Sequence, residues 1–176
     1  MPILQTRDKS ITDAEKSEFW KTHGHLSYRY TMLWTHKEKI DNKKQIEYCQ
    51  AICAFEAALL ACRVFMEFLG LGIKYNPHPV LVEKRAYFSR DGQTTDEIKV
   101  VDLGGSFVSL KELSASEQKT LAIIFHMAHK ATAHLTLGAQ DMSEPAIVHS
   151  AIPIIDHLLG VHLYNPLGKK PRRHWQ

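Results

Sequence analysis

The stretch that decides the fold runs from Asn42 to Gly72 and reads NKKQIEYCQAICAFEAALLACRVFMEFLGLG. After a polar opening it is almost continuously apolar, lacks proline, and is far longer than the roughly 4 to 8 residues of a buried strand. Its alanine, leucine, methionine and glutamate content favours a helix with Asp41 or Asn42 as N-cap and Gly70 and Gly72 at its end. At about 1.5 Å per residue it spans roughly 40 Å, which suits the central helix of a bundle.

Three charged side chains interrupt this apolar helix. Glu56, Arg63 and Glu67 stand at i, i+7 and i+11, which places them along one edge. They break every window of about 20 residues, so we predict a soluble core helix and no membrane association. One interpretation is an internal ion pair between Arg63 and Glu67, four residues apart. The other is functional: Arg63 faces the polar residues of another helix and is oriented by Glu56.

Length and composition indicate one domain with an ordinary soluble character. The 176 residues carry a net charge of only +3, which does not by itself indicate nucleic acid. We assign residues 1–168 to a single helical bundle domain and 169–176 to a basic C-terminal tail. Such a tail either follows a phosphate backbone or is a solvated terminus.

The cysteines and the first residues also favour a reducing cytoplasm. Residues 1–20 are polar and do not read as a signal peptide. Cys49, Cys53 and Cys62 lie within one predicted helix, where a disulfide framework is implausible and core-packing thiols are expected.

The segments before and after the central stretch predict further helices and an insertion. Thr12 is one of the candidate caps for a first helix, and Gly24 divides it from an aromatic-rich helix over 25–40. After Gly72, Asn76 and two prolines stop any helix, and the β-like runs VLVEKRAYFS and EIKVVDL follow. This insertion is too long for an ordinary helix connection in a bundle.

A clear helix start follows at Ser114, where Ser114 and Glu117 fit a capping box. In this helix His126, Lys130 and His134 recur at i, i+4 and i+8 as a polar stripe, and His129 lies beside it. Such a stripe meets solvent or another polar surface.

A last helix is predicted from Ser143 to Tyr164, bent at Pro153. The predicted fold is therefore all-α: an antiparallel bundle of four or five helices, with a long irregular or β-containing insertion between the central helices.

Two segments, FEAALLACRVFMEFLG and MAHKATAHLTLG, together resemble HEPN-like helical domains of prokaryotic defence and toxin–antitoxin proteins. The resemblance covers about residues 43–138. It implies an all-α domain, usually a homodimer, that binds a nucleotide or RNA or acts as a metal-independent ribonuclease, with an antitoxin as partner. The ribonucleases carry an R-x4-6-H motif. Counting back from His134 with four residues between, this chain instead has His129, followed by Lys130, which favours a catalytically degenerate domain.

Three functions follow from these patterns. The first is a dimeric, degenerate HEPN-like module whose nucleotide or RNA ligand contacts Glu56, His126 and His129. The second is an active ribonuclease, in which His134 is the base and Lys130 or Arg63 stabilises the developing phosphorane charge. Neither requires a metal or cofactor. The third is a metal-binding bundle that uses His126, His129 and a histidine of the last helix.

Overall fold

The computed structural model describes residues 11–21, 24–41, 47–85, 97–131 and 145–173. Its order of elements is α1 (Asp13–Trp20), α2 (His25–Asp41), α3 (Tyr48–Phe68), β1 (Leu71–Tyr75), β2 (Pro79–Glu83), the turns η1 (Val100–Leu103) and η2 (Leu110–Glu112), α4 (Ala115–Ala131), α5 (Pro145–Leu159) and the π-helical turn η4 (Gly160–Tyr164). The chain is therefore mainly helical, with one small two-stranded antiparallel sheet.

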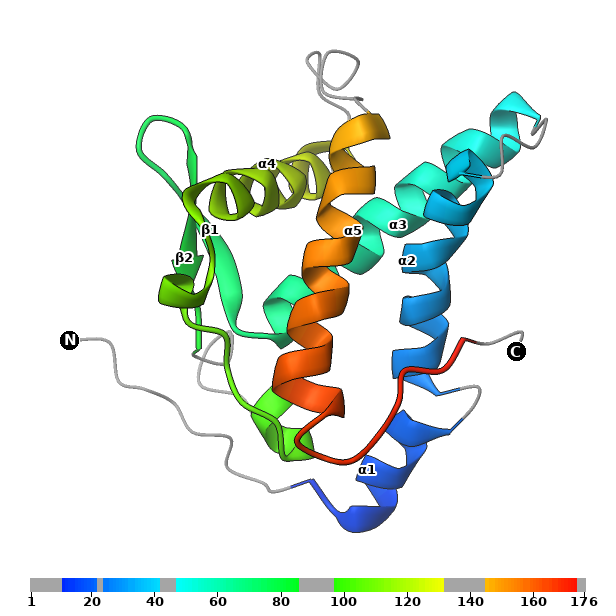
Figure 1. Cartoon of the computed structure of the whole chain (residues 1–176), viewed down its shortest axis with the longest axis vertical. Helices are drawn as coiled ribbons and strands as arrows, with labels where there is room; N and C mark the ends of the chain where they lie inside the picture. Colours follow the sequence, from blue (N-terminus) through cyan, green and yellow to red (C-terminus); the bar gives the residue numbers. More distant parts are fainter. Residues whose placement is uncertain (1–10, 22–23, 42–46, 86–96, 132–144, 174–176) are drawn as a thin grey trace.

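Figure 1 shows α5 standing upright through the centre, with α2 beside it and α4 lying across its upper end. The α3 helix crosses obliquely and contacts α2, α4 and α5. The predicted helical class is thus confirmed in outline, but the helices do not form the simple antiparallel bundle expected from the sequence. The small β1–β2 sheet packs against α4.

The core lies where α3, α4 and α5 meet. Its most deeply buried side chains are apolar, and they include Leu59, Phe65, Met66, Leu121, Ile124, Ile152, Ile155 and Leu159. These positions recur at helical spacing, so each of the three helices presents one continuous apolar face to the others. Cys62 is also fully buried in this core, and burial raises the pKa of its thiol to about 12, as expected for a packing cysteine.

One segment, Ala146–Tyr164, is long and apolar enough by length and composition to cross a membrane. The core helix of a water-soluble protein meets the same criterion. Here 44% of the most apolar window is buried inside the protein, and Ala151, Ile152 and Ile155 of α5 are fully buried. The placement of α5 is that of a core helix.

The start of α3 differs from the prediction. Its N-cap is Glu47, and Asp41 is the last residue of α2 rather than the cap of the next helix. Asn42 lies outside the described residues. The helix ends where expected: Leu69 is the C-cap and Gly70 has a left-handed φ of +82°. A side chain at Gly70 would also meet the ring of Phe107 at 2.5 Å, so both conformation and space require glycine there.

Of the two β-like runs in the predicted insertion, the first contributes a strand. Pro79–Glu83 forms β2 and pairs antiparallel with Leu71–Tyr75, with Ile73 opposite Leu81. The second run is not a strand: Val100–Leu103 forms a 3-10 turn that Gly104 closes with a left-handed φ of +93°. The two glycines after Leu103 favour this turn over an extended strand.

Local capping signals are confirmed. Thr12 accepts a hydrogen bond from the Glu15 backbone and its own N–H donates to the Glu15 carboxylate, which completes the first capping box. Ser114 and Glu117 make the same reciprocal pair at the start of α4. The predicted helix start at Ser143 lies outside the described residues, and α5 with η4 ends at Tyr164 as predicted.

Candidate functional site

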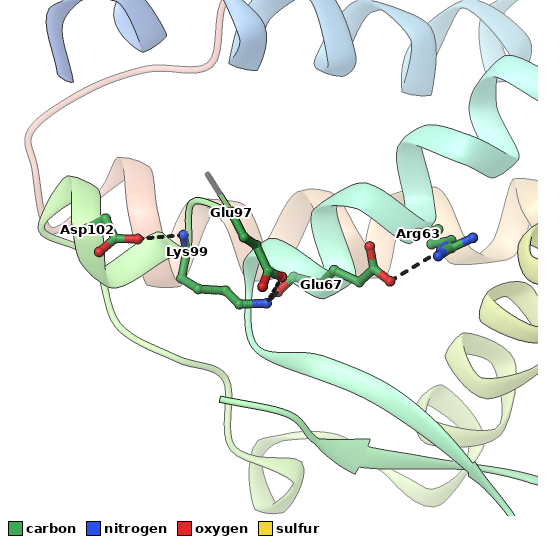
Figure 2. A network of polar contacts seen from close by, with 5 residues as sticks. All are labelled: Arg63, Glu67, Glu97, Lys99 and Asp102. Carbon is green, nitrogen blue, oxygen red and sulfur yellow. Dashed lines mark hydrogen bonds and ion pairs between the residues drawn. The ribbon is translucent and has the colours of Figure 1, made fainter. Parts of the chain in front are cut away.

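The ion pair predicted between Arg63 and Glu67 is present on α3 (Figure 2). Arg63 Nε lies 3.3 Å from Glu67 Oε1, and both side chains are about half-buried. The guanidinium carbon of Arg63 also lies 5.8 Å from the centre of the Phe125 ring on α4. Arg63 is therefore held in the interface between α3 and α4, the helix that carries the predicted histidine stripe.

Glu56 does not orient Arg63. It is exposed two turns earlier on α3, and seven residues of helix rise separate the two positions by about 10 Å along the axis. The carboxylate that holds Arg63 is that of Glu67. Arg63 thus pairs with its i+4 neighbour, as helical geometry favours, and the role of Glu56 at a ligand stays a prediction.

A fully buried lysine extends this network, and the sequence analysis missed it (Figure 2). Lys99 Nζ donates to the backbone carbonyl of Glu67 at 3.0 Å and pairs with Glu97, while its backbone N–H donates to Asp102 at 2.7 Å. The ammonium thus satisfies one of the last carbonyls of α3, where the helix dipole favours a cation. The sequence hints at this burial only in placing Lys99 between the apolar residues Ile98 and Val100 of EIKVVDL.

The histidines of α4 face different neighbours. His126 Nδ1 lies 2.6 Å from the hydroxyl of Tyr75 at the end of β1, and the two rings meet edge to face. His126 therefore contacts the hairpin. His129 is half-buried one turn beyond Phe125, the residue that contacts Arg63.

The predicted catalytic group is only partly placed by the structure. His134 and the side chain of Lys130 lie outside the described residues, so Arg63 is the one member whose contacts are defined. Within the described part of the chain, no three His, Cys, Asp or Glu side chains are grouped to hold a metal ion. The metal-binding alternative therefore has no support there.

A basic and aromatic hollow lies between α1, the start of α2 and the C-terminal segment. We call it the basic pocket; its volume is about 620 Å³. The aromatic residues that line it are Phe19, Trp20 and Tyr164, and the cationic ones are Lys21, Lys169, Lys170 and Arg172. Two segments far apart in the sequence, 19–21 and 164–172, thus bring four cations and three rings together.

The turn after η4 places the C-terminal segment in this position. Gly168 adopts a left-handed φ of +61°, and the N–H of Lys169 returns to the carbonyl of Tyr164 at 2.9 Å. Further along, Arg173 pairs with Glu38 and lies over the ring of Trp34 at 4.9 Å. Residues 169–173 therefore run along α1 and α2 (Figure 1), while Lys169, Lys170 and Arg172 stay exposed to solvent, so both interpretations of the tail remain predictions.

The charges in the basic pocket are only partly compensated. Lys21 pairs with Glu18 at 2.5 Å, and Lys169 Nζ lies 4.6 Å from the centre of the Trp20 ring. Lys170 and Arg172 are exposed and have no acidic partner among the residues that the structure describes. The pocket is consequently electropositive above an aromatic floor, the combination that attracts phosphates and planar rings.

A second hollow of about 480 Å³ adjoins the first, since Phe19 and Leu26 line both. Its polar lining combines His25 and Arg29 of α2 with Glu67 and Glu97. It therefore links the Glu67 network to the basic pocket but is mixed in charge, which makes it a poorer site for an anion.

Buried polar side chains also lie between α2 and α5. Tyr30 donates a hydrogen bond to Asp156 at 2.5 Å, and burial together with this carboxylate raises the pKa of Tyr30. His36 is 5% exposed, packs edge to face on Phe55, and has a pKa lowered first by burial and then by the charge of His149. Burial disfavours the charged imidazole, so His36 is kept neutral in the folded protein.

This burial predicts acid sensitivity. Above pH of about 6.5 His36 is neutral in both the folded and unfolded chain, so its contribution to stability is complete. Below that value the unfolded chain takes up the proton first, and the free energy of unfolding falls by up to about 1.4 kcal/mol per pH unit until the folded-state pKa is passed. We expect the free energies of unfolding of wild type and His36→Gln, measured by urea denaturation, to converge as the pH falls from 7 to 5.

The matched control is His78→Gln, which removes an exposed histidine from the hairpin turn. Its stability should run parallel to that of wild type over the same pH range. Parallel curves for His36→Gln as well would show that this imidazole is not the acid-sensitive group.

The chain matches no protein-family model, no curated protein and no solved structure. The resemblance of its two motifs to HEPN-like domains therefore remains a prediction. Two regions carry chemistry that bears on function: the Arg63 interface with α4 and the basic pocket.

Proposed function

We propose that this protein is a cytoplasmic nucleotide- or RNA-binding helical module, HEPN-like, dimeric and catalytically degenerate, whose ligand is held in the basic pocket. The observation that carries the proposal is the convergence of Lys170 and Arg172 with Trp20 in one hollow. Its volume of about 620 Å³ lies within the range of roughly 300–1,000 Å³ typical of small-ligand sites.

The two kinds of side chain suit the two parts of a nucleotide. Lysine and arginine neutralise phosphates and release condensed counterions, which supplies affinity without sequence preference. Aromatic rings offer stacking surfaces that accept any base. A protein with a net charge of only +3 can still bind a polyanion when its unpaired cations are concentrated in this way.

Removing two of these charges should weaken RNA binding. We expect Lys170→Ala with Arg172→Ala to lower affinity for a short single-stranded RNA by about 10-fold or more at low salt, measured by fluorescence anisotropy. Each phosphate contact contributes about 0.7 to the slope of log affinity against log salt on a single strand, so the slope should decrease in magnitude by about 1.4.

The control is the double variant Lys111→Ala with Lys119→Ala, which removes two exposed cations on η2 and α4, away from the pocket. It changes the net charge equally and should leave affinity nearly unchanged. Equal losses in both double variants would mean that binding follows net charge only, and unchanged binding in the pocket variant would refute the assignment.

An active ribonuclease is the second candidate, and the position of Arg63 against Phe125 of α4 favours it, since the guanidinium is turned toward the helix that leads to His134. This function predicts RNA cleavage in the presence of a chelator, abolished by His134→Ala. Gel analysis of RNA incubated with purified protein distinguishes the candidates. Absence of cleavage supports the degenerate module, while cleavage that survives His134→Ala removes this mechanism.

The proposed assembly is a homodimer, with an antitoxin protein as an additional partner. Both follow from the HEPN-like resemblance rather than from a contact in the single chain. The mass of the purified protein in solution tests the dimer directly, and a monomer would remove that part of the proposal.

A further inference from the structure

The face of Trp20 in the basic pocket is covered by a lysine that can be displaced. Trp20 ends α1 and is half-buried. The rings of Trp20 and Tyr164 meet edge to face, with their centroids 6.2 Å apart and an angle of 68° between their planes. Lys169 Nζ lies 4.6 Å from the centre of the Trp20 ring. Tyr164 is 3% exposed and forms part of η4. Lys169 is exposed, so of the two neighbours only the lysine can leave the ring without disturbing the core.

The backbone of Lys169 is fixed while its side chain is not. Its N–H is bonded to the carbonyl of Tyr164 at 2.9 Å, and the contact with Trp20 is the only one that its ammonium makes in the described part of the chain. A cation–π contact at an exposed site is weak, and base stacking on an aromatic ring is generally stronger. The four-carbon stem of the lysine allows its charge to move a few ångströms toward an anion.

We infer that a nucleobase displaces Lys169 from Trp20 and stacks on the indole, while the released ammonium joins Lys170 and Arg172 on the phosphates. This inference rests on the proposed function and makes it more specific. The ligand class is a base-bearing phosphate, either a free nucleotide or an unpaired nucleotide of a single strand. Bases in a duplex are stacked on one another and present no face to Trp20.

The test compares two ligands that share their phosphates. ATP and inorganic tripolyphosphate carry the same triphosphate chain, and only ATP has a base. We expect calorimetry to show that wild type binds ATP about 10-fold more tightly than tripolyphosphate. Trp20→Leu should remove this difference by weakening the binding of ATP while leaving the binding of tripolyphosphate unchanged.

Two further variants separate this inference from the proposed function. Tyr28→Leu removes an aromatic residue that is 49% exposed and does not line the pocket, and it should leave the preference for ATP intact. The double variant Lys170→Ala with Arg172→Ala should weaken the binding of both ligands.

The stacking inference is overturned if Trp20→Leu binds ATP as tightly as wild type does. It is also overturned if Trp20→Leu loses the same affinity for ATP and for tripolyphosphate. In either case, loss of binding in the Lys170 and Arg172 variant would leave the proposed function standing. If wild type binds neither ligand nor single-stranded RNA, the proposed function itself fails. Competition of bound ATP by single-stranded but not duplex RNA completes the expected pattern, and equal competition by duplex contradicts it.

Discussion

Replacing Lys99 with methionine is expected to lower the free energy of unfolding by about 3 kcal/mol. Methionine fills most of the space of the lysine stem, so the effect isolates the ammonium rather than the packing. In the variant, the carbonyl of Glu67 and the carboxylate of Glu97 both lose the ammonium as a partner, in a site where Lys99 is 1% exposed. Urea denaturation at pH 7 measures the change.

Two controls define the cause. Lys111→Met makes the same substitution at an exposed lysine on η2 and should change stability by less than about 0.5 kcal/mol. Adding Glu97→Leu to Lys99→Met should recover part of the loss, because it removes the carboxylate that paired with the ammonium. A Lys99→Met protein as stable as wild type would mean that the buried contacts of the ammonium make no net contribution to the free energy of unfolding.

Gly105→Ala is expected to destabilise the protein by about 3 kcal/mol or more, at the upper end of the range for overpacking. A Cβ at Gly105 would lie 2.4 Å from the backbone carbonyl of His162 and 2.6 Å from a methyl group of Val100. Backbone cannot rotate away as a side-chain end does. The next residue, Ser106, bonds to His162 through both its N–H and its hydroxyl, each at 3.0 Å, so a shift at Gly105 would also break this docking.

The matched control is Gly160→Ala, in the turn that continues α5. An added Cβ there meets only the side chain of Asn165, at 4.0 Å, and the backbone is helical. Alanine should be neutral or stabilising by up to about 1 kcal/mol. Thermal unfolding of the two variants separates the two effects. Similar midpoints would show that the segment before Ser106 relaxes without cost.

The parts of the fold that follow from nearest neighbours in the chain were predictable. The capping pairs at Thr12 and Ser114 and the ion pair of Arg63 with Glu67 each join residues three or four apart, so helical geometry alone places them together. The end of α3 was also predictable, because Gly70 adopts a backbone conformation that other residues rarely adopt.

The candidate site was not predictable, because it joins positions that no local rule connects. Trp20 and Lys169 are almost the whole chain apart, and they meet because η4 ends in a turn at Gly168 that directs the tail across α1. The basic tail is evident in the sequence, but no local pattern places it beside the aromatic residues of α1. His126 illustrates the same limit, since its partner Tyr75 comes from a strand that was not expected.

The sequence by itself determined that this chain is mainly helical, where several of its helices begin and end, and which charged residues interrupt its apolar faces. Only the tertiary structure decided that the helices cross rather than run as a simple bundle, that Lys99 is buried under the end of α3, and that the C-terminal cations gather over Trp20. The physical reason is range. Helix formation and capping depend on residues within about one turn, whereas burial and the convergence of charges depend on which distant surfaces pack together.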